Sequence, residues 1–304
     1  MTLRQVLEIC DLLDSPAADG KSVAEHFSRR GVSVNVQRVQ GDQGHTDFVS
    51  GVISGNGKGP TLGLIGRLGG IGARPSVLGL VSDADGAITA LSAALKLADM
   101  ARNGDVLPGP VRFATHICPD APTQPHEPTP FMGSPVDMET LNRQEVHPDM
   151  QAILTVDTTR GNRIINHRGF AISPTVKEGY ILRVSENLLD IMSWVTGKMP
   201  VVLPITTQDI TPYGNGLYHV NSILQPATAT QAPVVGVALT SEVPVPGPAA
   251  GANQIGDIEQ ATRFCVEVAK AFTAGRCRFC DDAEWKMIQS TYGSLDFLQR
   301  KKRS

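Results

Sequence analysis

The sequence predicts a three-layer α/β/α protein in which helices cover both faces of a central mixed sheet. Helix and strand signals alternate for most of the chain, and some strand segments are short apolar runs typical of a buried sheet. A length of 304 residues fits one hydrophobic core. We therefore expect a single α/β domain over residues 1–276 and a C-terminal extension over residues 277–304.

The composition excludes several classes of partner. Lys and Arg number 27 against 30 Asp and Glu, so the chain carries no bulk charge for a polyanion and we expect no nucleic acid. The longest apolar stretches, such as residues 234–239, fall far below the roughly 20 residues of a membrane helix. The first helix also carries charges that a signal peptide lacks. These features predict a soluble, cytoplasmic protein without a membrane partner.

The five cysteines, an odd number spread through a long chain, suit a reducing compartment better than a disulfide framework. Cys277 and Cys280 form a Cys-x-x-Cys pair, but no second ligand pair follows. We interpret them as two thiols in a polar turn, with a zinc site as the alternative.

The N-terminal half gives clear helix and strand signals. Apolar periodicity predicts helices at residues 3–13 and 22–30, and alternation or apolar runs predict strands at 32–39, 48–53 and 61–65. Next, Ser82 followed three residues later by Asp85 resembles a capping box that opens a long helix. Asp83 would then lie in the first turn of that helix.

The C-terminal half alternates in the same way around one irregular segment. Six prolines within residues 119–135 exclude regular structure there and predict a loop that could cover a site. The pattern elsewhere predicts strands at 111–117, 153–156, 201–205 and 233–239, and helices at 188–195, 216–224 and 258–272.

Charged residues stand where the loops of an α/β sheet converge, at the carboxyl ends of its strands. Arg67, Asp120 and Asp157 each follow a predicted strand, and Asp83 begins a helix. Three carboxylates meeting there would repel one another unless a divalent cation or basic groups held them. The alternative for each is a local role, at a helix start for Asp83 and in turns for the other two.

Other catalytic signatures are absent from the sequence. The glycine spacing fits neither a phosphate-binding loop nor a dinucleotide fingerprint, so we expect no nucleotide cofactor. Gly-x-Ser-x-Gly and His-Glu-x-x-His, which mark serine hydrolases and zincins, do not occur. Acidic residues at strand ends are the chemistry that remains.

The chain resembles the di-zinc exopeptidases, which include zinc aminopeptidases and carboxypeptidases. The similarity begins at Leu-Leu-Asp-Ser-Pro, residues 12–16, and continues to about residue 274. Asp83, within Ser-Asp-Ala-Asp-Gly-Ala, matches the segment whose carboxylate bridges both metals, and Asp120 and Asp157 end strands similar to those that carry further ligands. The resemblance implies a fold of the zinc-exopeptidase type and metal roles for these three residues.

The sequence also departs from that superfamily. Arg67 begins Arg-Leu-Gly where the family has His-x-Asp, and Pro119 replaces the general-base glutamate. Where the family has its last metal histidine, this sequence offers only Glu242 as a further ligand. The length and the proline-rich centre resemble a bacterial family catalogued as domain of unknown function 1177, a label that implies no activity.

The leading hypothesis is a hydrolase of a small peptide or amide with a remodelled metal site. Asp83, Asp120, Asp157 and Glu242 would hold zinc, manganese or magnesium, and an all-carboxylate set favours the latter two. General-base candidates are His116, His126 and Glu127, and Asp120 is expected to be catalytic as well as a metal ligand.

Two alternatives need no metal. In the first, the chain is a ligand-binding or regulatory descendant of a zinc exopeptidase, in which Arg67 binds an anionic group of a ligand or forms a salt bridge with Asp83 or Asp157. In the second, Asp and Arg residues carry out acid–base chemistry in an isomerase or lyase. In each case Asn215 and His219, within a polar-aromatic run, are expected to line the substrate site, with an ordinary helix cap as the other interpretation. A small-molecule substrate is the expected partner, and a symmetric homo-oligomer is expected on frequency alone.

Overall fold

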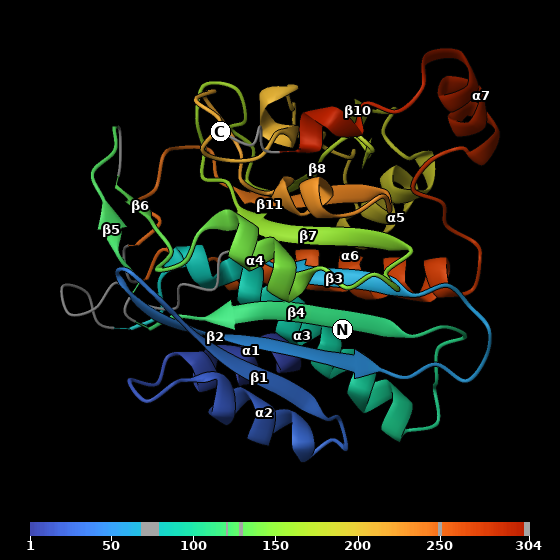
Figure 1. The fold of residues 1–304 in the computed structure, drawn as a ribbon. Helices are drawn as coiled ribbons and strands as arrows, with labels where there is room; N and C mark the ends of the chain where they lie inside the picture. The colour runs from blue at the N-terminus through green and yellow to red at the C-terminus, as the bar shows by residue number, and fades with distance from the viewer. Residues whose placement is uncertain (68–78, 120, 128–129, 249–250, 301–304) are drawn as a thin grey trace.

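The computed structural model describes residues 1–67, 79–119, 121–127, 130–248 and 251–300. Within them lies a nine-stranded mixed sheet in the order β1-β2-β4-β3-β7-β11-β9-β10, with β8 paired to β11 (Figure 1). Its strands are β1 (Val34–Gly41), β2 (Gly44–Ile53), β3 (Leu62–Gly66), β4 (Val111–Ile117), β7 (Ala152–Thr158), β8 (Gly169–Ile172), β9 (Val176–Lys177), β10 (Tyr180–Ile181) and β11 (Val234–Thr240). The predicted α/β class with a central mixed sheet is confirmed.

The four central strands run parallel, so their carboxyl ends meet at one edge of the sheet. β3 pairs in parallel with both β4 and β7, and β7 pairs in parallel with β11. In Figure 1 these strands all point to the left. β2 is antiparallel to β4, and β8 and β9 are antiparallel to β11. The parallel centre thus creates the crevice edge at which α/β proteins place their ligands.

One face of the sheet carries most of the α-helices. α3 packs on α1 and α6 and against β3, β4 and β7, while α2 contacts β1 and β2 and α5 contacts α6. The small residues of α3 let it lie close to the strands, and almost all of its first four turns are buried. These helices are α1 (Leu3–Leu13), α2 (Gly20–Ser28), α3 (Asp85–Arg102), α5 (Glu186–Thr196) and α6 (Ile255–Thr273).

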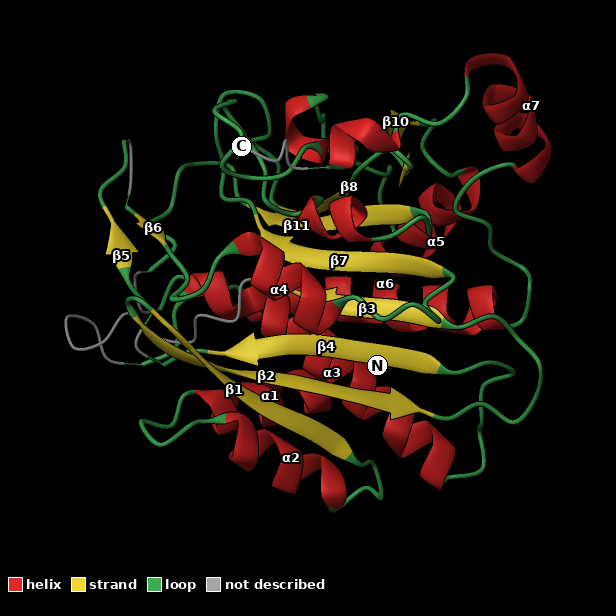
Figure 2. Cartoon of the chain, viewed as in Figure 1, coloured by secondary structure: helices red, strands yellow, loops and turns green. Residues whose placement is uncertain are grey.

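The opposite face is covered mainly by irregular chain. Among the described residues its helices are α4 (Met138–Glu145) and the short 3-10 helices η2 (Gln208–Ile210) and η3 (Gln225–Ala229). Ile210, Ile223 and Leu224 pack there on Ile65 and Ile153 of the sheet in a second hydrophobic cluster. Figure 2 shows how much of this part of the chain is loop. The outer layers are therefore unequal in regularity.

Several local predictions were wrong in detail. Residues 216–224 form turns, because Gly214 and Gly216 adopt positive φ angles of 78° and 80°, which suit turns and not helices. The predicted strand at 201–205 makes only a single bridge, between Val202 and Ile172. Ser82 does not cap α3, because it lies in the 3-10 turn η1 (Ser82–Ala84) and its hydroxyl donates to the Gly247 carbonyl at 3.0 Å.

The remaining elements lie outside the sheet. Within the proline-rich segment that was predicted to be a loop, β5 (Thr123–Gln124) pairs with β6 (Phe131–Met132). α7 (Asp282–Tyr292) and η4 (Asp296–Gln299) follow Cys277 and Cys280, whose thiols are free. Of the helices in the described ranges, none has both the length and the apolar character to cross a membrane.

The start of α3 touches the ends of β3 and β7 through backbone atoms. A Cβ built on Gly86 would lie 1.9 Å from the Arg67 carbonyl oxygen and 2.6 Å from that of Val156. We therefore expect Gly86→Ala to lower the free energy of unfolding by about 1–3 kcal/mol or more, since backbone must move to admit the methyl group.

Gly256 in the first turn of α6 is the matched control, because a Cβ there meets no atom within 4 Å. Gly256→Ala should leave stability unchanged or raise it by up to about 1 kcal/mol, as expected for alanine in a helix. Urea denaturation of both variants measures the difference. Equal stabilities would show that the helix–sheet contact can relax.

Candidate functional site

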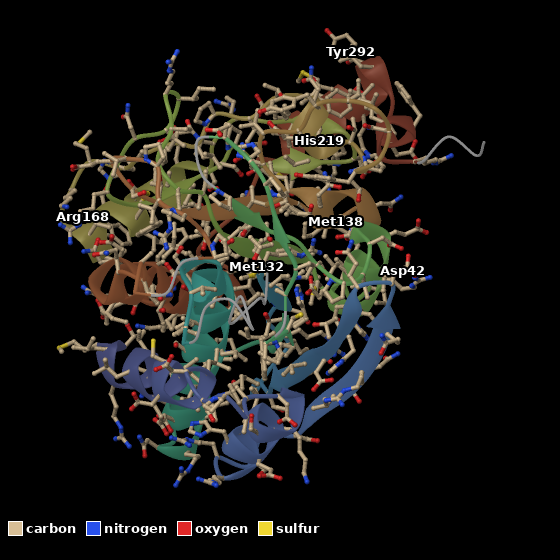
Figure 3. The ribbon with its side chains drawn as sticks, turned by 90° about the vertical axis from the view of Figure 1, so that its left-hand side faces the viewer. Asp42, Met132, Met138, Arg168, His219 and Tyr292 are labelled. Carbon is tan, nitrogen blue, oxygen red and sulfur yellow. The ribbon has the colours of Figure 1, made fainter. Side chains whose placement is uncertain are left out.

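Two aspartates from different elements lie close together at the carboxyl edge of the parallel strands. Asp157 is near the end of β7, and Asp83 lies in η1, just before α3. The Asp83 backbone amide donates to the Gly247 carbonyl at 3.1 Å, and its carboxylate accepts a hydrogen bond from the Met132 backbone amide. Figure 3 views this edge of the molecule, with Met132 near its centre. The β5–β6 segment thus reaches the candidate site.

Asp157 is held by two hydrogen bonds. Its side chain is buried, the Ser222 hydroxyl donates to Oδ2 at 2.8 Å, and the Thr158 backbone amide donates to Oδ1 at 2.7 Å. Burial raises the pKa of the Asp157 carboxyl, while these two donors act in the opposite direction. The carboxylate is therefore oriented, although its negative charge is poorly solvated.

Asp83 is the more strongly perturbed of the two. Burial, followed by repulsion from Asp157, raises its pKa to about 7, with Arg160 opposing the rise. Neither Asp83 nor Asp157 forms an ion pair with any residue in the described part of the chain. The pair can share a proton or accept a cation, because either would relieve the repulsion.

A third aspartate nearby is already neutralised. The buried Asp85 carboxylate pairs with the Arg160 guanidinium and accepts a hydrogen bond from the Asn253 side chain. Burial still raises the Asp85 pKa to about 6 against both partners. Arg160 also donates to the Ser82 carbonyl at 3.4 Å, which joins the loop after β7 to the start of α3.

The Arg67 side chain is fully buried. Its exposed fraction is 0%, and Nε donates to Glu145 Oε2 at 2.6 Å while Nη2 donates to Asn142 Oδ1 at 2.6 Å. His116 Nδ1 lies 2.9 Å from the other Glu145 oxygen. An ionised carboxylate can only accept, so Nδ1 carries the proton. Arg67, Glu145 and His116 form a buried network between β3, β4 and α4.

This network corrects one expectation for Arg67. The structure shows Glu145 as its ion-pair partner, whereas the sequence suggested Asp83 or Asp157. Glu145 was missed because α4 has few apolar residues and its helical pattern is weak. With no exposed surface, the Arg67 guanidinium has no access to an external anion in this conformation.

The other predicted residues are distributed around the same edge. His116 is 1% exposed, whereas Glu127, His126 and Glu242 are exposed. Asp120 lies outside the described residues. Within the described ranges, no group of three or more His, Cys, Asp or Glu side chains has an arrangement suited to a metal ion. The predicted metal and general-base roles thus stay predictions.

Asn215 and His219, whose predicted role in substrate binding stays a prediction, lie in the loop between η2 and η3, where Asn215 is exposed. Asn215 Nδ2 donates to the Thr211 hydroxyl at 2.7 Å, and His219 Nε2 lies 3.2 Å from the same oxygen. The His219 ring stacks on Tyr213 with 4.4 Å between centroids. Tyr213 hydrogen-bonds Ser222, the donor to Asp157. Burial raises the Tyr213 pKa, so its hydroxyl stays protonated.

Residues 37–302 match the family described as "Protein of unknown function (DUF1177)". The chain belongs to this family. No curated protein matches the sequence. The predicted family is thereby confirmed, and membership in DUF1177 assigns no reaction.

Solved structures with a similar fold include metallopeptidase-like enzymes. The bottromycin maturation enzyme BotP in complex with Mn has a TM-score of 0.56 and 15% identity, over 88% of this chain and 71% of that chain. The cytosol aminopeptidase from Coxiella burnetii has a TM-score of 0.55 and 14% identity, over 87% and 68%. The leucine aminopeptidase from Caenorhabditis elegans has a TM-score of 0.53 and 13% identity, over 89% and 66%. At such identities the similarity shows a shared exopeptidase-like fold.

The buried Arg67–Glu145 pair yields a stability prediction. Glu145→Gln leaves the guanidinium without its counter-charge, which should lower the free energy of unfolding by about 3–5 kcal/mol. Glu25→Gln removes an exposed salt bridge with Lys21 and should change the free energy of unfolding by less than about 0.5 kcal/mol. Chemical denaturation of the two variants provides the measurement. A loss below 1 kcal/mol at Glu145, on the order of a surface pair, would contradict the buried pairing.

The raised pKa of Asp83 predicts a pH dependence in chelator-treated protein. The unfolded carboxyl ionises near pH ~4, whereas the folded one keeps its proton to about pH 7. The folded state thus binds more protons between these values, so the free energy of unfolding should fall as pH rises through this window. Asp85 contributes to the fall up to about pH 6.

In Asp83→Asn the free energy of unfolding should fall less steeply between about pH 6 and 7, because the titrating carboxyl group is gone. Asp42→Asn, at an exposed position, should leave this pH dependence unchanged. Denaturation curves across this pH range test both variants. An unaltered slope in Asp83→Asn would mean that Asp83 titrates normally.

Proposed function

We propose that this chain is a divalent-metal-dependent hydrolase of a small peptide or amide substrate. The observation that carries the proposal is the Asp83–Asp157 pair, two mutually repelling carboxylates at the carboxyl edge with no ion-pair partner among the described residues. The exopeptidase-like fold, shared with an enzyme solved in complex with Mn, supports the same interpretation.

The donor chemistry of the pair fits a hard or borderline divalent cation. Carboxylate oxygens suit Mn²⁺ and Mg²⁺, while zinc sites more often use imidazole or thiolate. Asp83 and Asp157 would hold the ion, with Asp120 and Glu242 as further proposed ligands. Asp85 is a weaker candidate because Arg160 already neutralises it. When bound, such an ion supplies a Lewis acid that polarises a substrate carbonyl.

The surrounding residues have separate positioning roles. Ser222 and the Thr158 amide orient Asp157, and the Met132 amide fixes Asp83. The Tyr213 hydroxyl, protonated because burial raises its pKa, donates its hydrogen to Ser222, whose own hydrogen goes to Asp157, and so helps to orient Ser222. For proton transfer, His116 is the weaker candidate because it is buried and hydrogen-bonded to Glu145. Glu127 and Asp120 remain the proposed groups for this role.

A metal-free acid–base enzyme is the second candidate, and the same pair supports it. A carboxyl with a pKa of about 7 beside another carboxylate can accept and return a proton near neutral pH. In that case Asp83 acts as the acid or base and Asp157 sets its pKa. Metal content separates the two candidates.

The test is elemental analysis of protein purified without chelators, together with manganese titration. Wild-type protein should contain a stoichiometric divalent metal, or bind Mn²⁺ and gain thermal stability. Asp83→Asn and Asp157→Asn should each weaken Mn²⁺ binding at least about tenfold, since even loss of an outer-shell contact to a metal site costs that much. Asp42→Asn, exposed on the β1–β2 hairpin, is the matched control.

Dipeptides and amides should then be screened for hydrolysis with the metal-loaded protein. Turnover that is lost in Asp83→Asn and retained in Asp42→Asn is the expected result. If wild-type protein neither contains nor binds a divalent metal, the metallohydrolase proposal is wrong and the acid–base candidate takes its place.

A further inference from the structure

A cavity of about 260 Å³ lies beside the candidate site, within the irregular layer, where α4 faces Tyr213 and the η3 segment. Met138, at the start of α4, is labelled below His219 in Figure 3 and lines the cavity. The volume of the cavity is near the lower end of ligand pockets and suits a molecule about the size of one amino acid. The lining residues are Met138, Glu139, Asn142, Arg143, Pro212, Tyr213, Gln225, Thr228, Ala229 and Gln299.

The inner wall of the cavity is held in place by its own hydrogen bonds. Asn142 Nδ2 donates to the Gln225 carbonyl at 3.0 Å and to the Thr228 hydroxyl at 3.1 Å. The Gln225 side chain accepts from the Tyr213 amide at 3.2 Å and donates to the Thr211 carbonyl at 2.8 Å. Because these groups bond to each other, the cavity is formed before any ligand enters, which lowers the entropic cost of binding.

The groups that remain to contact a ligand are of two kinds. Met138, Pro212, Tyr213 and Ala229 supply apolar surface. Arg143 supplies positive charge: it is exposed, forms no ion pair in the described part of the chain and makes one hydrogen bond, from Nη2 to the Thr140 hydroxyl at 3.0 Å. Its planar guanidinium is suited to bind a carboxylate through two parallel hydrogen bonds.

The cavity is also connected to the proposed catalytic pair. Tyr213, on its wall, hydrogen-bonds Ser222, and Ser222 donates to Asp157 at 2.8 Å. Asn142, on the opposite wall, holds the Arg67 guanidinium. A ligand that contacts Tyr213 is therefore connected to Asp157 through two hydrogen bonds.

We propose that this cavity binds a small monocarboxylate with an apolar body, its carboxylate on Arg143 and its apolar part against Met138 and Tyr213. Glu139, at the rim one helical turn before Arg143, disfavours a second negative charge on the ligand. The carboxylate belongs either to the substrate itself or to a separate effector. As a substrate subsite the inference rests on the proposed hydrolase function, whereas binding can be measured without it.

Binding is tested with N-acetyl-leucine and N-acetyl-phenylalanine against their uncharged carboxamides and against succinate. The protein is the full chain with ¹³C-labelled methionine methyl groups, the Met138 signal being assigned with Met138→Leu. The two N-acetyl amino acids should shift the Met138 signal and leave that of the exposed Met199 in place. Carboxamides should bind at least about tenfold more weakly, the usual scale for losing a charge-assisted hydrogen bond. Succinate should also bind more weakly, because it has no apolar body and its second carboxylate is repelled by Glu139.

Two variants locate the site. Arg143→Gln should weaken binding of the N-acetyl amino acids at least about tenfold, and Ala229→Trp should abolish it by filling the cavity. Arg29→Gln, at an exposed arginine after α2, should have no effect. If neither N-acetyl amino acid shifts Met138, or if Arg143→Gln binds them as well as wild type, the inference is wrong.

Kinetics distinguish a carboxylate that belongs to the substrate from one that belongs to an effector. Binding measurements distinguish this inference from the hydrolase proposal. With a turned-over amide, a substrate subsite predicts that Arg143→Gln raises KM, whereas an effector site predicts an unchanged KM and loss of modulation by N-acetyl-leucine. If wild-type protein neither contains nor binds a divalent metal but still binds the N-acetyl amino acids, the hydrolase proposal fails and this inference stands. If the protein binds metal and hydrolyses amides but does not bind the N-acetyl amino acids, the hydrolase proposal stands and this inference is wrong.

Discussion

The architecture around the candidate site depends on neutralising one buried cation, Arg67. A guanidinium with no exposed surface at the end of a central strand is strongly destabilising unless a counter-charge and hydrogen-bond acceptors surround it. Glu145 provides the charge, Asn142 Oδ1 and Met138 Sδ accept from the other two guanidinium nitrogens, and His116 pairs with the second Glu145 oxygen. Since Asn142 also bonds the η3 segment, this one cation fixes α4, and with it much of the irregular layer, relative to the sheet.

The acidic groups of this edge fall into two sets with different electrostatics. Glu145 and Asp85 are each matched by an arginine, so their charges are compensated inside the protein. Asp83 and Asp157 lie between these ion pairs without a cation of their own among the described residues. Uncompensated charge in a buried setting persists in proteins mainly where binding or catalysis requires it. The difference between the two sets singles out Asp83 and Asp157 as the functional pair.

The sequence predicted the features that depend on local pattern and missed those that depend on assembly. The buried strands and α1, α3 and α6 carry strong periodicity, and Asp83 and Asp157 were located because they end or begin such elements. α4 was missed because its exposed face is highly polar, and Glu145 was missed with it. The helix expected at 216–224 fails because Gly214 and Gly216 favour turns, a conformational preference that outweighs the few apolar positions that follow. The roles of Arg160, Tyr213 and Ser222 arise only when distant segments pack together.

The two outer layers of the sheet differ in how much sequence change they tolerate. The helical face packs α3 against the strands at backbone contact distance, so few substitutions there are tolerated. The opposite face is built largely from turns, which accept changes of length and sequence more readily. Tyr213, Ser222 and Gln225 all come from this second layer. Relatives with the same sheet can therefore acquire different ligand preferences by remodelling a single face while the pair of carboxylates stays in place.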